Sequence, residues 1–102
     1  MPVLKRSESS IQTAVVKYAR QLGWRCRKRS TSGPMGSNGE PDYEFMRPRR
    51  RLFFIEFKAP GKTSTPLQLQ MQAEIAACGY DVFECDDAAK GKALVALKMK
   101  MP

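Results

Sequence analysis

Apolar residues recur with helical spacing near the start of the chain. Those that follow the three- and four-residue steps of one helix face are Ile11, Val15, Tyr18 and Leu22. Ser7 belongs to the residue types that cap helix N-termini, and Gly23 to those that end helices. The pattern predicts an amphipathic helix between Ser7 and Gly23.

The central part of the chain has the alternation and β-branched or aromatic content of strands. Trp24–Arg29 predicts a strand with three arginines on one face. A loop of small residues, Ser30–Glu40, separates it from a second strand at Pro41–Met46. A basic turn, Arg47–Arg51, then leads into the most apolar segment, Leu52–Ala59, which we expect to be the central strand.

The C-terminal half predicts a helix, a strand and a helix. Thr65 followed by Pro66 is a helix start signal, and this helix is expected to carry an apolar stripe of Leu67, Met71, Ile75 and Cys78 before Gly79 ends it. Tyr80–Cys85 is the fourth strand. Asp86 or Asp87 then caps a last helix over Ala88–Leu97, which Gly91 should weaken.

The resulting order is αβββαβα. A short turn between the second and third strands implies an antiparallel hairpin, and the later strand–helix–strand crossover implies a parallel pair. We therefore expect one α/β domain over residues 1–102, with a small mixed sheet flanked by helices.

Composition narrows the possible chemistry. The chain contains no histidine, which excludes Ser-His-Asp triads, Cys-His pairs, histidine-ligated zinc and an imidazole base. Catalysis would have to use carboxylates, lysine, tyrosine, cysteine or a metal ion held by oxygen ligands.

The net charge is +8, and all of it lies in the first half of the chain. An uneven positive charge favours a polyanionic partner, nucleic acid first and an anionic membrane second, although it also serves solubility. Three cysteines without a CxxC pair are typical of a reducing compartment with buried free thiols. With no secretory signal and no apolar run long enough to span a bilayer, a soluble cytoplasmic protein is expected.

A candidate site lies on the predicted hairpin. Glu56 and Lys58 leave the same face of the central strand, and folding the hairpin about Arg49 places Asp42 opposite Glu56. Two carboxylates with Cβ atoms roughly 5 Å apart repel each other unless a cation lies between them. Mg²⁺ suits such a site together with a substrate phosphate, and Lys58 beside it could orient the attacking water.

Each of these residues also has a simpler interpretation. Asp42 could start a turn after Pro41, Glu56 and Lys58 could form a surface pair, and Glu8 could complement the dipole of the first helix. Their combination in a basic chain favours the metal site.

The same residues resemble a known family. Pro41-Asp42 followed by Glu56-Phe57-Lys58 is similar to the PD-(D/E)xK nuclease signature, and the αβββαβ order resembles the restriction-endonuclease-like core of that superfamily. A closer resemblance is to virus-type replication-repair nuclease (VRR-NUC) domains, extending from about Glu8 to Leu97. It is carried by Glu8, Gly39-Glu40-Pro41-Asp42, the run Phe54–Gly61, Pro66-Leu67-Gln68 and Gly79.

The resemblance implies hydrolysis of DNA phosphodiesters with Mg²⁺ or Mn²⁺. By position, Asp42, Glu56 and the backbone carbonyl of Phe57 would bind the metal ion, and Lys58 would handle the attacking water. Glu8 would bind a metal ion or its water. Gln68 would support the site, although by itself it reads as an exposed helix residue.

The chain resembles the stand-alone members of this family, which are similar to phage proteins that form homodimers and cut four-way DNA junctions. A two-fold dimer would supply the two active sites that two opposed cuts require. Leu94, Val95 and Leu97, or a sheet edge, are candidate dimer contacts, with ordinary core packing as the alternative for each.

Basic residues outside the site are candidates for phosphate contacts that read little sequence. They are Arg25, Arg27, Lys28, Arg29, Arg47, Arg49, Arg50, Arg51 and Lys62. The Arg47–Arg51 cluster could instead be a solvated turn, and Ser30–Glu40 could shape the entry to the site.

The sequence thus predicts a structure-selective DNA endonuclease that acts as a homodimer on Holliday junctions or related branched DNA. Two alternatives stay open: a non-catalytic DNA-binding module with a nuclease fold, and a flap- or end-directed nuclease that acts as a monomer. A restriction enzyme is disfavoured because few residues remain for base readout. A membrane-surface protein is disfavoured because no long exposed apolar stripe matches the basic residues.

Overall fold

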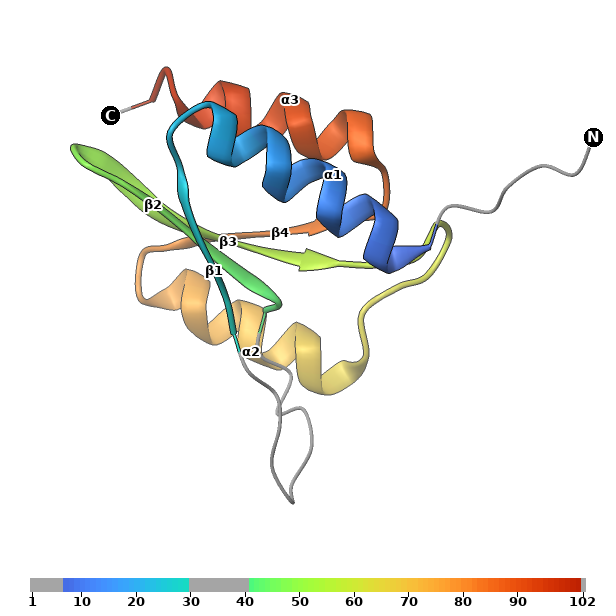
Figure 1. The fold of residues 1–102 in the computed structure, drawn as a ribbon. Helices are drawn as coiled ribbons and strands as arrows, with labels where there is room; N and C mark the ends of the chain where they lie inside the picture. Colours follow the sequence, from blue (N-terminus) through green and yellow to red (C-terminus); the bar gives the residue numbers. More distant parts are fainter. Residues whose placement is uncertain (1–6, 30–40, 102) are drawn as a thin grey trace, which may run out of the picture.

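The computed structural model describes residues 7–29 and 41–101, so the predicted loop Ser30–Glu40 lies outside the described residues. The elements follow the predicted order (Figure 1). They are α1 (Glu8–Gln21), β1 (Arg25–Lys28), β2 (Tyr43–Arg47), β3 (Arg50–Phe57), α2 (Pro66–Ala77), β4 (Asp81–Cys85) and α3 (Ala88–Lys98).

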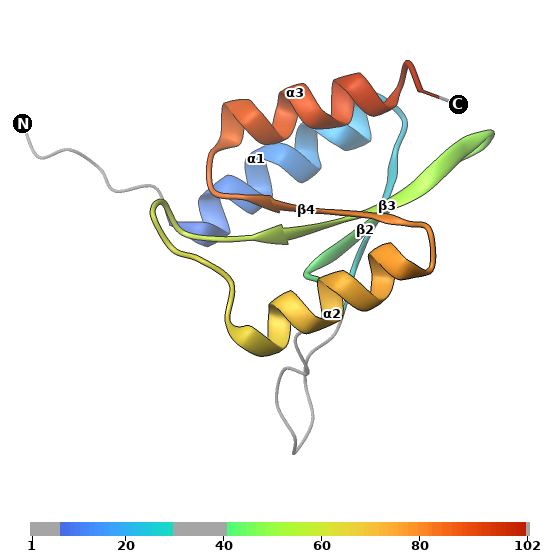
Figure 2. The same ribbon diagram turned by 180° about the vertical axis from the view of Figure 1, so that it is seen from behind.

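The strands form one mixed sheet in the order β1-β2-β3-β4. β1, β2 and β3 are antiparallel neighbours, and β4 is parallel to β3. Helices α1 and α3 lie together on one side of the sheet and α2 lies on the other, as the two opposite views show (Figures 1 and 2). The predicted fold class, a small mixed sheet flanked by helices, is confirmed.

The hairpin has the predicted register but a shorter turn. Tyr43 pairs with Ile55 and Phe45 with Phe53, which is the register obtained by folding about Arg49. The turn itself is only Pro48-Arg49, because Arg47 pairs with Arg50, and an irregularity between Phe45 and Arg47 reconciles the two registers. The predicted basic turn over 47–51 was therefore too long, and the third strand begins at Arg50 rather than Leu52.

The core lies between the α1–α3 layer and one face of the sheet. Phe45 and Phe53 are fully buried and stack with ring centroids 4.8 Å apart, and Trp24 meets Phe53 edge-on at 5.1 Å. The Trp24 indole N–H donates to the Val95 carbonyl at 3.3 Å, which ties the end of α1 to α3. Val95 is fully buried in the core, and Leu94 packs against it. Leu97 is thus the exposed residue among the three candidate dimer contacts on this helix.

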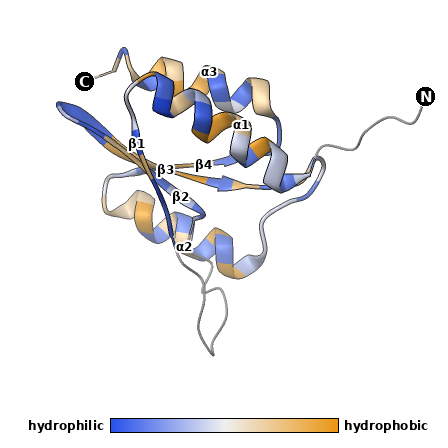
Figure 3. Cartoon of the chain, in the orientation of Figure 1, coloured by the Kyte–Doolittle hydropathy of each residue, from blue (hydrophilic) through white to orange (hydrophobic). Residues whose placement is uncertain are grey.

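The side chains of β3 alternate between two different environments. Phe53, Ile55 and Phe57 belong to the core cluster, whereas Glu56 and Lys58 contact Gln68 of α2. Along the hairpin, Figure 3 shows hydrophilic residues at the tip and more hydrophobic residues where β3 enters the sheet. The side of the sheet that faces α2 is called the polar face below.

Two glycines permit close packing at positions where a side chain would collide. A Cβ on Gly91 would lie 2.5 Å from Val15 and 2.8 Å from the Cys85 sulfur, so this glycine allows α3 to approach α1 and β4 closely. It was predicted only to weaken the helix. Gly23 has φ +96° and lies against the guanidinium of Arg47, which donates to the Leu22 carbonyl at 2.8 Å.

The apolar stripe predicted on the second helix is not buried. Leu67 is 46% exposed and Cys78 is exposed, while Met71 and Ile75 are half-buried. The reason is that α2 packs mainly on β4 and covers the polar face only in part. Of the three free cysteines, Cys85 is buried, Cys26 is half-buried and Cys78 is exposed, so the expectation of buried thiols fails for Cys78.

In the described part of the chain, no helix combines the length and the apolar character needed to cross a membrane.

Candidate active site

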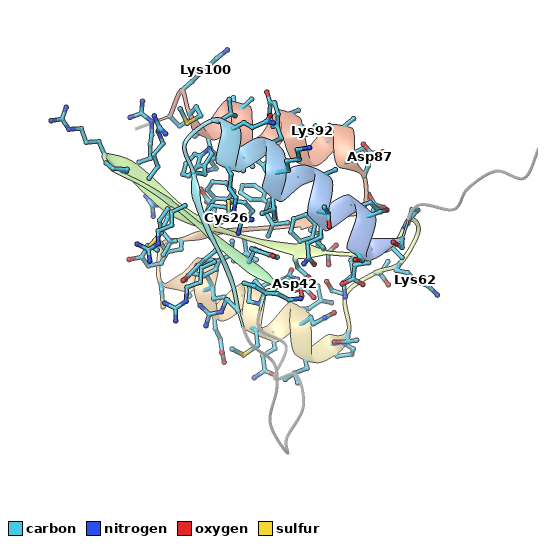
Figure 4. All side chains as sticks on the ribbon, viewed as in Figure 1. Cys26, Asp42, Lys62, Asp87, Lys92 and Lys100 are labelled. Atoms are coloured by element: carbon cyan, nitrogen blue, oxygen red, sulfur yellow. The ribbon has the colours of Figure 1, made fainter. Side chains whose placement is uncertain are left out.

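The carboxylate of Asp42 is fixed where β2 begins. Its Oδ2 accepts a hydrogen bond of 2.7 Å from the backbone N–H of Phe57 on β3. Tyr43, the next residue, pairs with Ile55, so continuation of the register by one step places Asp42 opposite Glu56. In Figure 4 the labelled Asp42 appears between the ribbons of α1 and α2. Asp42 and Glu56 therefore lie next to each other on neighbouring strands, as the hairpin register predicts.

Gln68 forms hydrogen bonds with both Glu56 and Lys58. Its side-chain N–H donates to Glu56 Oε1 at 2.6 Å, and its Oε1 accepts from Lys58 Nζ at 2.5 Å. Lys58 Nζ also lies 3.5 Å from Glu56 Oε1, and both side chains are largely buried. The helix start fixes Gln68 in place, because Thr65 and Gln68 form a reciprocal capping box at the N-terminus of α2.

Burial and the neighbouring negative charge of Asp42 disfavour the charged form of Glu56 when no cation is bound. Glu56 is 3% exposed. Its pKa is raised to about 7, first by burial and second by the neighbouring Asp42 carboxylate, while Lys58 opposes the shift. Burial also raises the pKa of Asp42, although the Phe57 N–H and nearby lysines act in the opposite direction.

Among the residues that the structure describes, one oxygen of the Glu56 carboxylate has no hydrogen-bond partner. Glu56 Oε2 is buried and accepts no hydrogen bond, while Oε1 is held by Gln68. A buried carboxylate oxygen without a partner, beside a second carboxylate, fits a hard divalent cation such as Mg²⁺. The donor set present is therefore compatible with the predicted metal ion.

No third acidic side chain of the described residues forms a metal-binding group with this pair. Within residues 7–29 and 41–101, no three His, Cys, Asp or Glu side chains group closely enough to hold a metal ion. Glu8 is exposed in the first turn of α1, where it complements the helix dipole. Phe57 contacts Asp42 through its N–H. The ligand roles of Glu8 and of the Phe57 carbonyl stay predictions.

A small cavity of about 130 Å³ adjoins Lys58. It is lined by Lys58, Lys62, Glu84 and Asp86, which places the predicted DNA contact Lys62 beside the site. Sequence reasoning missed Glu84, which pairs in register with Glu56 on the parallel strand β4 and accepts a hydrogen bond from Ser64. Its position depends on the crossover through α2, so no short-range sequence signal indicates it.

Apart from Lys62, the predicted basic residues fall into two groups. The first lies on the edge strand β1, where Arg27 is 72% exposed and both Arg27 and Arg29 approach Glu44 at 3.7 and 3.4 Å. Arg25 and Lys28 on the same strand are also exposed. The Arg29 backbone N–H donates to the Asp42 carbonyl, so this strand leads directly to the site.

The second group lies at the hairpin turn. Glu56 lies six residue steps along β3 from Arg50, a distance of about 20 Å along an extended strand. Arg47 and Arg50 bind the backbone carbonyls of Leu22 and Met99 and so anchor the hairpin. Arg49 and Arg51 are exposed, with Arg51 also placed over the Tyr80 ring.

Together, the fold and the site define an α/β protein with a restriction-endonuclease-like core and an Asp–Glu–Lys cluster on the polar face of its sheet. The chain is 34% identical over 79 residues to "Putative nuclease p44" of Acyrthosiphon pisum secondary endosymbiont phage 1. The similarity covers 78% of this chain and 82% of the phage protein, and the chain belongs to the same family. No protein-family model matches the chain, so the narrower VRR-NUC assignment stays a prediction.

Proposed function

We propose that this protein is a nuclease, and more narrowly a divalent-metal-dependent endonuclease that hydrolyses DNA phosphodiesters. The observation that carries the proposal is the pair of carboxylates Asp42 and Glu56, with one buried Glu56 oxygen lacking a hydrogen-bond partner and Lys58 alongside. Membership in a family with a phage protein named as a nuclease supports the same activity.

Asp42 and Glu56 would hold a Mg²⁺ or Mn²⁺ ion. When bound, such an ion polarises a phosphate oxygen and lowers the pKa of a water molecule. The Lys58 ammonium, held by Gln68, can donate a hydrogen bond to the attacking water or to a phosphate oxygen as negative charge develops there. The water oxygen would form the new bond to phosphorus as the bond from phosphorus to the ester oxygen breaks. The water would lose a proton to solvent, and the leaving oxygen would take up a proton from solvent.

The cations of β1 support DNA as the substrate. Arg25, Arg27 and Lys28 are exposed on the edge strand that leads to Asp42, and they are suited to contact the phosphate backbone. We propose that the substrate is branched DNA, such as a Holliday junction, and that a homodimer makes the two opposed cuts. A dimer is favoured because the described part of one chain contributes one cluster of this kind, whereas resolution needs two.

Cleavage of an end-labelled four-way junction tests this proposal. Matched duplex, flap and single-stranded DNA are incubated in parallel with Mg²⁺, Mn²⁺ or EDTA, using wild type, Glu56→Gln, Lys58→Ala and the exposed-site control Lys100→Ala. We expect paired nicks in opposed strands that require metal, with about 10³-fold less cleavage by Glu56→Gln, equivalent to roughly 4 kcal/mol of transition-state stabilisation. The Lys100→Ala protein should cut like wild type.

Other results would favour the alternatives. Tight junction binding without cleavage in either metal would indicate a non-catalytic DNA-binding module. Light scattering that detects only particles of one chain's mass, together with cleavage of flaps and not of junctions, would indicate a monomeric flap- or end-directed nuclease.

A further inference from the structure

A groove that the nuclease chemistry does not use runs along α1. Its volume is about 500 Å³, and it is lined by Tyr43 of β2 and by six α1 side chains between Gln12 and Gln21. Among these are Lys17 and Arg20, both exposed. No acidic side chain is among the described residues that line it, so the groove has a positive charge.

Arg20 is oriented by the edge strand. One guanidinium nitrogen donates to the Cys26 carbonyl of β1 at 3.4 Å, which directs the side chain from α1 toward the sheet edge. Lys17 precedes it by three residues and so lies on the same side of the helix. Two cations one helical turn apart can each contact a phosphate of one nucleic-acid strand.

The groove and the candidate active site lie on opposite faces of the sheet and adjoin where β2 begins. Tyr43 directly follows Asp42, and its ring meets the ring of Phe57 edge-on at a centroid distance of 6.0 Å. Lys28 is the cross-strand partner of Tyr43. Lys28 is exposed, so a further cation lies beside Tyr43 at this edge of the sheet.

The size and chemistry of the groove favour an unpaired strand. A cavity of this volume accommodates a small molecule or a short stretch of nucleotides, and is too small for a double helix. Sites for single strands combine cations along the backbone with an aromatic ring against which a base stacks. Lys17, Arg20 and Tyr43 provide both features.

We propose that this groove binds an unpaired DNA strand that passes from the cut phosphate around the edge of the sheet, where Asp42 precedes Tyr43, with Lys17 and Arg20 on its phosphates and Tyr43 against a base. The proposal rests on the proposed function, because it takes the cut phosphate to lie at Asp42 and Glu56. It adds a substrate requirement: the enzyme prefers DNA with unpaired nucleotides at the branch.

Binding of a fluorescein-labelled 12-nucleotide oligo(dT) to the whole 102-residue chain, measured by anisotropy in EDTA, tests the groove separately from cleavage. The double variant Lys17→Ala/Arg20→Ala is compared with Lys90→Ala/Lys100→Ala, which removes the same charge from exposed positions outside the groove. We expect the groove variant to bind about 10-fold more weakly and to lose roughly 1.4 from the slope of log affinity against log salt. The control should retain the wild-type slope.

The aromatic contact has its own pair of variants. Tyr43→Phe keeps the ring and should bind like wild type, whereas Tyr43→Leu should bind roughly 5- to 100-fold more weakly. If Tyr43→Leu does not fold, the Lys17/Arg20 variant decides. Equal affinity and salt slope in the groove variant and its control would overturn the proposal.

Two further outcomes are informative. An equal loss of binding to a 12-base-pair duplex would overturn the preference for an unpaired strand. Because binding is measured without metal, it can be interpreted even if the protein does not cleave DNA. If the groove variant cleaves and binds like wild type, the groove proposal is wrong and the proposed nuclease function stands.

Discussion

On one face of the sheet Phe53 and Phe57 are fully buried beneath α1 and α3, whereas on the other Glu56 and Lys58 meet α2, a helix without a fully buried residue. Both sets of side chains come from β3 and its end, in alternation. The apolar face therefore stabilises the fold, while the polar face holds charged groups whose burial opposes folding. Predictions that substitute one face at a time test this separation.

The largest effect is a loss of folding stability, which we expect to differ between two neighbouring phenylalanines of β3 that lie on opposite faces. Phe53→Ala should lower the free energy of unfolding by about 3–5 kcal/mol, because Phe53 is fully buried against Phe45 and Trp24. Phe54, on the polar face beneath Arg29, is 7% exposed, and Phe54→Ala should cost at least about 1 kcal/mol less. Urea unfolding of both variants measures the difference. An equal or larger loss in Phe54→Ala would mean that both faces contribute alike to the core.

A smaller effect of opposite sign is expected at Glu56. Its folded-state pKa of about 7 lies above the ordinary value of 4.5, so its contribution to stability is present below pH 4.5 and is lost as the pH rises through 7. In EDTA at pH 8, Glu56→Gln should therefore be more stable than wild type by about 1–3 kcal/mol. At pH 5 most of this difference should disappear.

Urea unfolding at the two pH values measures this prediction. Mg²⁺ added at pH 8 should stabilise wild type and leave Glu56→Gln nearly unaffected. If the stability difference between the two proteins stays constant from pH 5 to pH 8, the ionisation of Glu56 does not destabilise the fold.

The smallest of the three effects concerns Gln68. Because Gln68 holds both Lys58 and Glu56, Gln68→Ala should lower cleavage about 10- to 100-fold, as is usual for residues that orient a metal site. Gln70→Ala, an exposed position on the same helix, is the matched control and should retain activity. Cleavage rates under single-turnover conditions provide the measurement. Similar rates for the two variants would show that Lys58 is positioned without Gln68.

The candidate site could be predicted to the extent that it is local in sequence. Asp42 and Glu56 lie on strands joined by one short turn, and alternation on both strands fixes which residues share a face. The prediction placed the turn differently, yet the pairing was correct, because the irregularity near Met46 restored the register. Gln68 was found only through a family resemblance, since its contacts span a loop and a helix start.

Burial was harder to predict than element boundaries. The apolar stripe of α2 looked like a core face, but burial depends on what another element covers, and α2 reaches mainly β4. Gly91 looked like a weak point in a helix, although it permits contact with Val15 and Cys85. Arg47 and Arg50 were predicted as DNA contacts, and the sequence did not indicate that their guanidinium groups donate to backbone carbonyls distant in the chain.

The sequence by itself determined the element order, the hairpin register and the two carboxylates that face each other, because these follow from periodicity and short-range turns. Only the tertiary structure decided that Glu56 keeps a buried oxygen without a partner, that Glu84 lies beside the site, and that α1 and Tyr43 form a groove. These features depend on how helices dock on a sheet, and docking is set by contacts between residues that are distant in the chain.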